Sequence, residues 1–249
     1  MIPDGFVDTG WHFGPAAVPP RRYQVFGERS SGTNFVKRLI GRNSALTPIE
    51  ALGWKHAVPH MTAIPADVAV VVCVRDARSW SRSMHAKPWH TPPVMQALDY
   101  SAFIRHPWDT VADHKRYFPQ VAEHGGTGQP LQHDRHPLTG AVFQNLFELR
   151  TVKLQAHLSF LNRKCTVILC RMEAVTAAPQ DFLRSLHDTY GLPSAQENYR
   201  PVVKRLGSKF RASVETRPDT PRDIPAEDLD FLRQNIDLDL EAKLGYHYD

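Results

Sequence analysis

The sequence predicts an α/β protein in which a central, mostly parallel sheet lies between helices as a three-layer sandwich. Apolar runs of strand length alternate with amphipathic segments of helix length, the pattern of βαβ units with right-handed crossovers. Residues 68–74 are an unbroken, mostly β-branched run, which is typical of a parallel strand covered on both faces. The length of 249 residues suits one domain, so we expect a single domain over residues 1–249.

The first part of the chain gives an arm, a strand and a helix. Residues 1–20 are rich in glycine and proline and predict an N-terminal arm over the domain. An apolar run at residues 23–26 predicts a strand, and a helical pattern starts at Phe35 and ends near Gly41, a suitable C-cap. Residues 52–59 read as a short strand-like piece closed by proline.

After the strand at 68–74, Ser79 is the expected N-cap of a helix. Residues 85–140 lack clear periodicity and contain seven of the thirteen histidines, so we expect them to cover an acceptor site. An amphipathic helix is expected from Gln144 to about Arg163, with an apolar stripe formed by Phe147, Leu154, Leu158 and Leu161. A strand at 165–170, a helix from Pro179 to Gly191 and a last helix from Pro225 toward Gly245 follow it.

The loop between the first strand and helix has the composition of an anion site. Glycine lets the backbone approach an anion closely, and the first N–H groups of a helix point toward it with the positive end of the dipole. Side chains in the loop add a charge and several hydrogen-bond donors. The expected ligand-binding residues of the loop are Arg29, Ser30, Ser31, Gly32, Thr33 and Asn34.

This loop is not a complete Walker A motif. Gly27 and Gly32 have the right spacing, but Thr33 and Asn34 stand where that motif has lysine followed by serine or threonine. The lysine binds the β and γ phosphates, so its loss favours an anion other than ATP. An ATP-dependent phosphotransferase and a non-catalytic nucleotide-binding protein remain as alternatives.

Composition narrows the range of partners. The net charge of +4 comes from scattered basic residues with no polybasic block, which disfavours nucleic acid and membrane surfaces and fits a small anionic ligand. Cys73, Cys165 and Cys170 lie in or beside apolar runs and predict buried thiols in a reducing compartment. No apolar stretch reaches the length of a signal or a membrane span, so we expect a soluble, cytoplasmic protein.

The segment Phe26-Gly-Glu-Arg-Ser-Ser-Gly-Thr-Asn34 resembles the 5′-phosphosulfate loop of the sulfotransferases that use 3′-phosphoadenosine 5′-phosphosulfate (PAPS), especially small members with a Gly-Glu-Arg-x-Ser-Gly-Thr-Asn version. The resemblance implies a P-loop NTPase-like sulfotransferase architecture, PAPS as cofactor and 3′,5′-adenosine bisphosphate as product, with no metal required. It also explains the missing Walker lysine.

Two further segments extend the resemblance to the 3′-phosphate. Arg75 follows the strand at 68–74 and Ser83 stands eight residues later, as in the family's pair that holds this phosphate. An arginine at a strand end would face the ligand crevice of an open α/β sheet, which makes the assignment physically reasonable. Lys204 and Arg205 only partly match the family's late 3′-phosphate segment, and a solvated basic loop is an equal alternative.

The segment Trp54 to Pro59 resembles the family's Lys-x-His before a proline-bearing turn, which implies that His56 is the catalytic base. Here Lys55 and His56 are adjacent, so on a strand they would face opposite sides and one of them would be misassigned. The implied reaction is in-line sulfuryl transfer, in which Arg29 and Lys55 neutralise the departing phosphate.

The sequence does not identify the acceptor of the sulfuryl group. A carbohydrate is the first expectation and a small hydroxylated metabolite the second, with Trp89 and Trp108 able either to stack on a ring or to anchor the loop. His133 and His136 are spaced for one helical face, but no strong third ligand accompanies them, so a solvated loop is favoured over a metal site.

Overall fold

A computed structural model describes residues 2–193, 198–203 and 209–249. These residues form two compact units, which are described separately. Among the described residues, the first comprises 2–76, 153–193, 198–203 and 237–249, and the second comprises 77–152 and 209–236.

The first unit contains a mixed sheet of five strands among the described residues, in the order β1-β5-β4-β2-β3. The strands are β1 (Trp11–Phe13), β2 (Arg22–Phe26), β3 (Thr47–Pro48), β4 (Val68–Val74) and β5 (Thr166–Arg171). All neighbours are parallel except β1, which pairs antiparallel with β5. The prediction of an α/β protein with a mostly parallel sheet is confirmed.

β4 lies at the centre of this sheet for the reason its sequence predicts. All seven of its residues are buried, and it pairs in parallel with β2 on one side and β5 on the other. A strand covered on both faces needs apolar side chains in both directions, which a run of valines provides.

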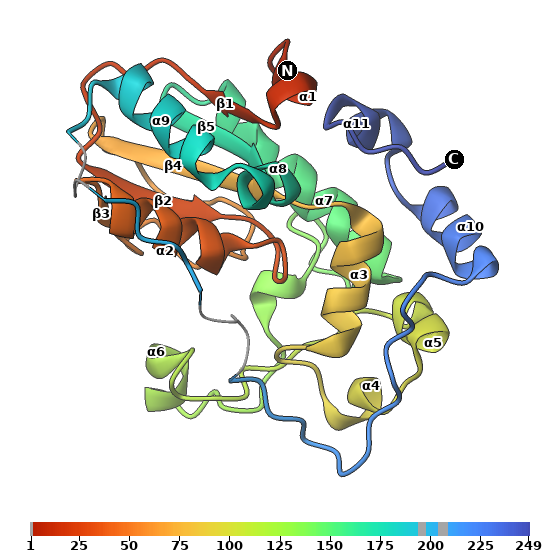
Figure 1. The fold of residues 1–249 in the computed structure, drawn as a ribbon. Helices are drawn as coiled ribbons and strands as arrows, with labels where there is room; N and C mark the ends of the chain where they lie inside the picture. Colours follow the sequence, from red (N-terminus) through yellow and green to blue (C-terminus); the bar gives the residue numbers. More distant parts are fainter. Residues whose placement is uncertain (1, 194–197, 204–208) are drawn as a thin grey trace. The chain divides into compact units, whose positions relative to one another are not determined.

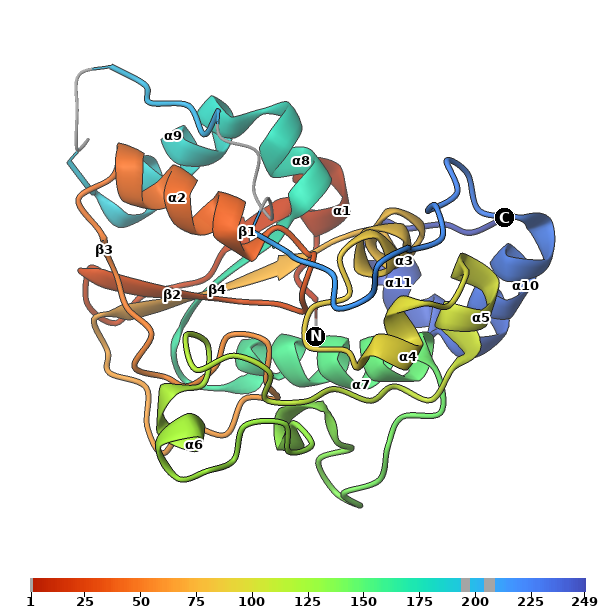
Figure 2. The same ribbon diagram turned by 90° about the horizontal axis from the view of Figure 1, so that it is seen from below.

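Helices flank both faces of the sheet within the first unit. α2 (Thr33–Asn43), α8 (Met172–Ala177) and α9 (Pro179–Tyr190) pack on one face, where Tyr23 and Val25 join their apolar side chains. On the other face Phe26 meets Phe160 at 5.0 Å between ring centroids. Figures 1 and 2 show α2 and α9 on one side of the strands and the end of α7 (Leu146–Leu158) on the other.

The sheet reverses its direction of winding between β2 and β4. After β2 the chain moves outward to β3, whereas after β4 it proceeds the other way to β5 (Figure 1). The carboxyl ends of two such strands border a crevice, the usual ligand site of an open α/β sheet. The loop at Gly27 and the turn at Arg75 follow β2 and β4, so both lie at this edge.

In the second unit α3 (Ala77–Ala86) leads into the histidine-rich segment. The rest of that segment forms only short helices: α4 (Pro93–Gln96), α5 (Tyr100–Arg105), α6 (Pro119–Glu123) and a 3₁₀ turn, η1 (Gln132–Asp134). α10 (Ala226–Asn235) completes this unit, where Ser101 donates to the buried carboxylate of Asp228 at 2.6 Å. Trp80 and Trp108 are fully buried, so Trp108 anchors its segment rather than offering a stacking surface.

Several predicted boundaries are wrong. Gly41 lies inside α2, which ends at Asn43 with Ser44 as its C-cap, and a Cβ at position 41 would lie 2.8 Å from the Tyr23 hydroxyl, so close packing accounts for the glycine. Ser79 lies within α3, which begins at Ala77. The last helix is two, α10 and α11 (Leu238–Lys243), because Asp237 starts a new helix by accepting from Leu240 N at 3.0 Å.

The N-terminal arm is more ordered than the sequence indicates. It contains a short helix, α1 (Phe6–Thr9), and β1, whose three residues extend the sheet beside β5. The predicted stripe of the long helix is partly correct: Phe147, Leu154 and Leu158 are buried on α7, whereas Leu161 lies in the following 3₁₀ turn, η2 (Ser159–Asn162). Among the described residues no helix has both the length and the apolar character needed to cross a bilayer.

Candidate functional site

The loop from Gly27 to Gly32 has a backbone that only glycine permits at its two ends. Gly27 has φ +151° and a Cβ there would lie 2.5 Å from the Cys73 carbonyl oxygen. Gly32 has φ +94°, and a Cβ there would lie 2.1 Å from the Met172 sulfur. The glycine spacing seen in the sequence is therefore a packing requirement between the loop, β4 and the first residue of α8.

α2 begins directly after this loop. Gly32 is its N-cap and has no side chain with which to cap the first N–H groups. The first turn holds no acidic residue that would compete for those groups. Thr33 is buried and Asn34 exposed at the start of the helix, so the dipole and the first N–H groups favour an anion at this end.

The loop is braced by its own side chains and by the neighbouring strand. Glu28 Oε1 accepts from Arg29 N at 2.7 Å and from Arg29 Nε at 3.0 Å. Ser31 Oγ donates to Glu28 O at 2.6 Å, and Arg75 Nη1 donates to Ser30 O at 2.8 Å. Arg75 thus reaches the loop from the end of β4, as its position at the strand end leads one to expect.

His56 is fixed to the first residue of the loop. Its Nδ1 lies 2.6 Å from the Gly27 carbonyl oxygen, and Gly27 N donates to the Lys55 carbonyl at 3.1 Å. Because a carbonyl oxygen can only accept, Nδ1 must carry the proton, which leaves Nε2 as the basic nitrogen. Burial first, and then the charge of Lys55, hold the pKa of His56 well below its usual value, so the neutral imidazole dominates near neutral pH.

Lys55 and His56 both reach the loop because their segment is a turn. Residues 54–57 adopt turn geometry rather than the predicted strand, so adjacent side chains need not face opposite sides. Lys55 Nζ donates to Asn34 Oδ1 at 2.5 Å. Burial lowers the pKa of Lys55 to about 8, partly offset by the carboxylate of Glu50.

A lysine that sequence reasoning did not single out completes this cluster. Lys153 on α7 is fully buried and donates to the His56 carbonyl at 2.8 Å, with Glu28 Oε2 at 3.1 Å from its ammonium. The ring of Trp54 lies 5.6 Å from Arg29 Cζ and 5.7 Å from Lys153 Nζ. The available signal was a run of polar residues, Arg150, Lys153 and His157, on the buried stripe of the helix.

We call the loop of residues 27–34, with Lys55, His56 and Arg75, the anion corner. Ser83, the predicted partner of Arg75, is a half-buried residue of α3 in the second unit, so the pairing stays a prediction. Lys204 and Arg205 lie outside the described residues.

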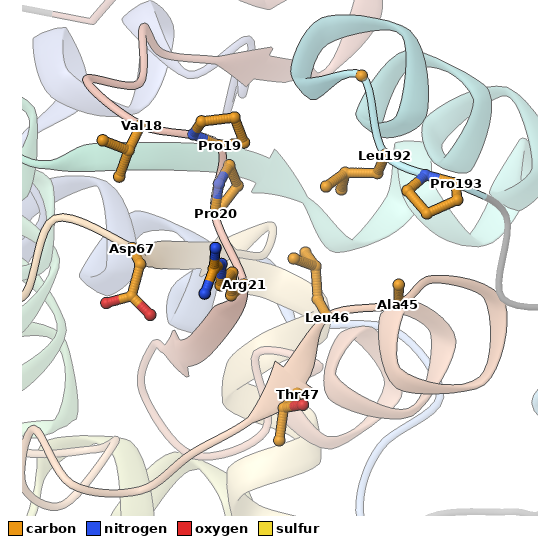
Figure 3. A pocket seen from close by; sticks show the side chains of 11 residues that line it. Val18, Pro19, Pro20, Arg21, Ala45, Leu46, Thr47, Asp67, Leu192 and Pro193 are labelled. Carbon is orange, nitrogen blue, oxygen red and sulfur yellow. The ribbon is translucent and has the colours of Figure 1, made fainter.

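A pocket of about 690 Å³ lies at the opposite edge of the sheet (Figure 3). Arg21 and Asp67, which immediately precede β2 and β4, line it together with apolar residues that include Pro20, Leu46 and Leu192. Asp67 is already held in a bidentate pair by Arg22, at 2.6 and 2.9 Å. We call it the amino-end pocket, and its described lining contains no histidine, lysine or cysteine.

The described residues contain no group of three or more His, Cys, Asp or Glu side chains arranged to hold a metal ion. Between the two histidines considered above, Asp134 is buried and accepts from the Thr110 hydroxyl at 2.6 Å. Its carboxylate therefore has a structural role in the second unit.

Comparisons of the chain with protein-family models, with curated proteins and with solved structures gave no match. The anion corner itself has three chemical capacities: it can bind an anion at the start of α2, neutralise it with Arg29 and Lys55, and accept a proton at His56 Nε2.

Proposed function

We propose that the protein is a sulfotransferase that moves a sulfuryl group from PAPS to a hydroxyl or amine of an acceptor. The single observation that carries the proposal is the contact between His56 Nδ1 and the Gly27 carbonyl at 2.6 Å. This bond joins a neutral histidine to the first residue of the proposed anion-binding loop. Group transfer requires a base near the bound donor, and simple anion binding does not.

The residues of the anion corner fit the donor. Gly32 as N-cap directs backbone N–H groups toward an anion, and Arg29 and Lys55 supply charge beside it. Thr33 and Asn34 replace the lysine and hydroxyl that serve a triphosphate and magnesium, which favours a phosphosulfate over ATP. Arg75 lies at the same edge and is the proposed ligand of the 3′-phosphate.

The protein's part in the reaction is positioning, charge neutralisation and proton transfer. His56 Nε2 takes the proton of the acceptor, a contribution of roughly 10²- to 10⁴-fold for general-base catalysis. Arg29 and Lys55 neutralise the charge that grows on the leaving phosphate. When bound, PAPS supplies the sulfuryl group on a good leaving group.

For the acceptor we propose a carbohydrate first and a small hydroxylated metabolite second. In the second unit the half-buried ring of Trp89 lies 5.8 Å from Tyr117 and 5.3 Å from Phe210, measured between centroids. Partly exposed aromatic rings of this kind suit the apolar face of a sugar.

Thermal unfolding with 3′,5′-adenosine bisphosphate, compared with ADP and with ATP plus magnesium, tests the proposal. A ligand at one hundred times its Kd stabilises the folded state by about 2.7 kcal/mol, which raises the Tm measurably. We expect the largest shift with the bisphosphate. A larger shift with ATP and magnesium would instead support a phosphotransferase.

Release of bisphosphate from labelled PAPS separates an enzyme from a binding protein. Release by the wild-type protein that is lost in His56→Ala supports catalysis. Tight binding of the bisphosphate without any release in the presence of hydroxylated acceptors would favour a non-catalytic nucleotide-binding protein.

A further inference from the structure

Lys153 lies beside the anion corner and is fully buried, with 0% of its surface exposed. Lysine is almost never fully buried unless its ammonium is paired, because removal of a charge from water is costly. The neighbouring polar positions on the same face of α7 behave differently. His157, one turn further, binds the Ala57 carbonyl at 3.0 Å, and burial lowers its pKa to about 4, so it contributes no charge near neutral pH.

The ammonium of Lys153 joins two parts of the site that are distant in sequence. It donates to the His56 carbonyl at 2.8 Å and lies 3.1 Å from Glu28 Oε2. The other oxygen of that carboxylate binds Arg29 through Nε and the main-chain N–H. One buried lysine therefore contacts the turn that carries the base and, through Glu28, the arginine of the loop.

The surroundings of Glu28 show what the ion pair with Lys153 contributes to the site. Among the described residues, Glu28 Oε2 has no hydrogen bond of good geometry, so its compensation is the ion pair with Lys153. Loss of the lysine would leave a buried carboxylate oxygen without its cation. It would also leave the His56 carbonyl without this donor, and that turn is what places His56 against Gly27.

We propose that Lys153 is a positioning residue of the sulfuryl-transfer site, which holds the His56 turn and the Glu28–Arg29 pair in register with the loop. The inference rests on the proposed function. A buried ion pair that only stabilises the fold is the competing explanation, and the two differ in whether removal of the entire pair restores activity.

Three variants distinguish these explanations. Lys153→Met keeps the length of the side chain and removes the charge. Glu28→Gln combined with Lys153→Met also removes the uncompensated carboxylate, so it should recover stability. Lys164→Met, at an exposed position, is the matched control.

In steady-state kinetics with labelled PAPS we expect Lys153→Met and the double variant to lose about tenfold to a hundredfold in kcat, since small misplacements of reacting groups cost that much. In the double variant the affinity for 3′,5′-adenosine bisphosphate, measured by calorimetry, should fall less than kcat, because Glu28 braces Arg29 but the first turn of α2 is intact. Wild-type kcat in the double variant, or equal losses in binding and kcat, would overturn the positioning role.

A measurement on the ligand-free protein keeps this test independent of activity. The Nδ1 proton of His56 bonds to Gly27, so its resonance should be protected from exchange in proton NMR of wild type and Lys164→Met. We expect loss of that protected resonance in the double variant. Its persistence there would overturn the inference whatever the substrate is, whereas absence of bisphosphate binding by wild type would overturn the proposed function alone.

Discussion

The two edges of the sheet in the first unit differ in how their charged groups are satisfied. At the amino-end pocket the charge on Asp67 is matched by Arg22 through two hydrogen bonds, and apolar side chains form much of the remaining wall. At the anion corner Arg29, Lys55 and Arg75 surround a loop that contains one carboxylate, Glu28. The described pocket is thus at the edge with fewer charged groups, and cations gather where the strands end.

The difference follows from the direction of the strands. Parallel strands place all their carboxyl ends at one edge, and helices that follow them begin there with their positive ends. The amino-end pocket lies where strands β2 and β4 begin, and none of its described lining residues belongs to the first turn of a helix. The amino-end pocket therefore serves as an internal control for the anion corner.

The largest loss of activity is expected for His56→Ala. Turnover of PAPS should fall by roughly 10²- to 10⁴-fold because the proposed general base is removed, while the bisphosphate still binds. Steady-state kinetics and calorimetry on the same preparation measure the two quantities. Because the pKa of His56 is held well below its usual value, the wild-type rate should stay level from pH 7 down to pH 6; a fall centred near 6.5 would show that the base has an ordinary environment.

The second largest change, a loss of nucleotide affinity, is expected for Arg75→Ala. Loss of a charged hydrogen bond should weaken binding of 3′,5′-adenosine bisphosphate by about tenfold to a hundredfold. Binding of adenosine 5′-phosphosulfate, which lacks the 3′-phosphate, should change far less. Equal losses for both ligands would mean that Arg75 acts through its bond to the Ser30 carbonyl and not on the 3′-phosphate.

The lowered pKa of Lys55 leads us to expect that binding of 3′,5′-adenosine bisphosphate depends on pH. Its pKa of about 8 in the ligand-free protein means that the ammonium is present below pH 8 and is lost as the pH rises above it. A bound anion favours the ammonium, so affinity should decrease above pH 8 with a limiting slope of about tenfold per pH unit. Lys55→Arg keeps its charge throughout and should abolish this slope; an identical slope in that variant would assign it to another group.

The smallest effect is expected at the amino-end pocket. Asp67→Asn breaks a partly exposed ion pair with Arg22, which solvent screens, so the Tm should change little. The affinity for the bisphosphate should remain within about twofold of wild type. A tenfold loss would indicate that the nucleotide uses this pocket.

The sequence was most informative where a short pattern has one structural solution. The valine-rich run of β4 and the glycines of the loop were predicted at their observed positions, because burial on both faces and close backbone approach each restrict the choice of residue. The helix from Pro179 to Gly191 was likewise correct, with Gly191 in the left-handed conformation at its C-cap.

Prediction failed where distant residues decide the structure. Gly41 suggested a helix end, but it lies inside α2, where the Tyr23 hydroxyl leaves little room for a side chain. β1 has only three residues and exists because β5 offers an edge. Lys153 reads as an ordinary helical lysine, and only the fold brings Glu28 and the His56 carbonyl to its ammonium.

Hydrogen–deuterium exchange with and without 3′,5′-adenosine bisphosphate tests the central claim most directly, because it reports on both edges of the sheet in one experiment. We predict that the nucleotide slows exchange in residues 27–36 and around Arg75, and leaves residues 18–21 and 45–47 unchanged. Protection at the amino-end pocket without protection of the loop would contradict the assignment of the anion corner as the nucleotide site.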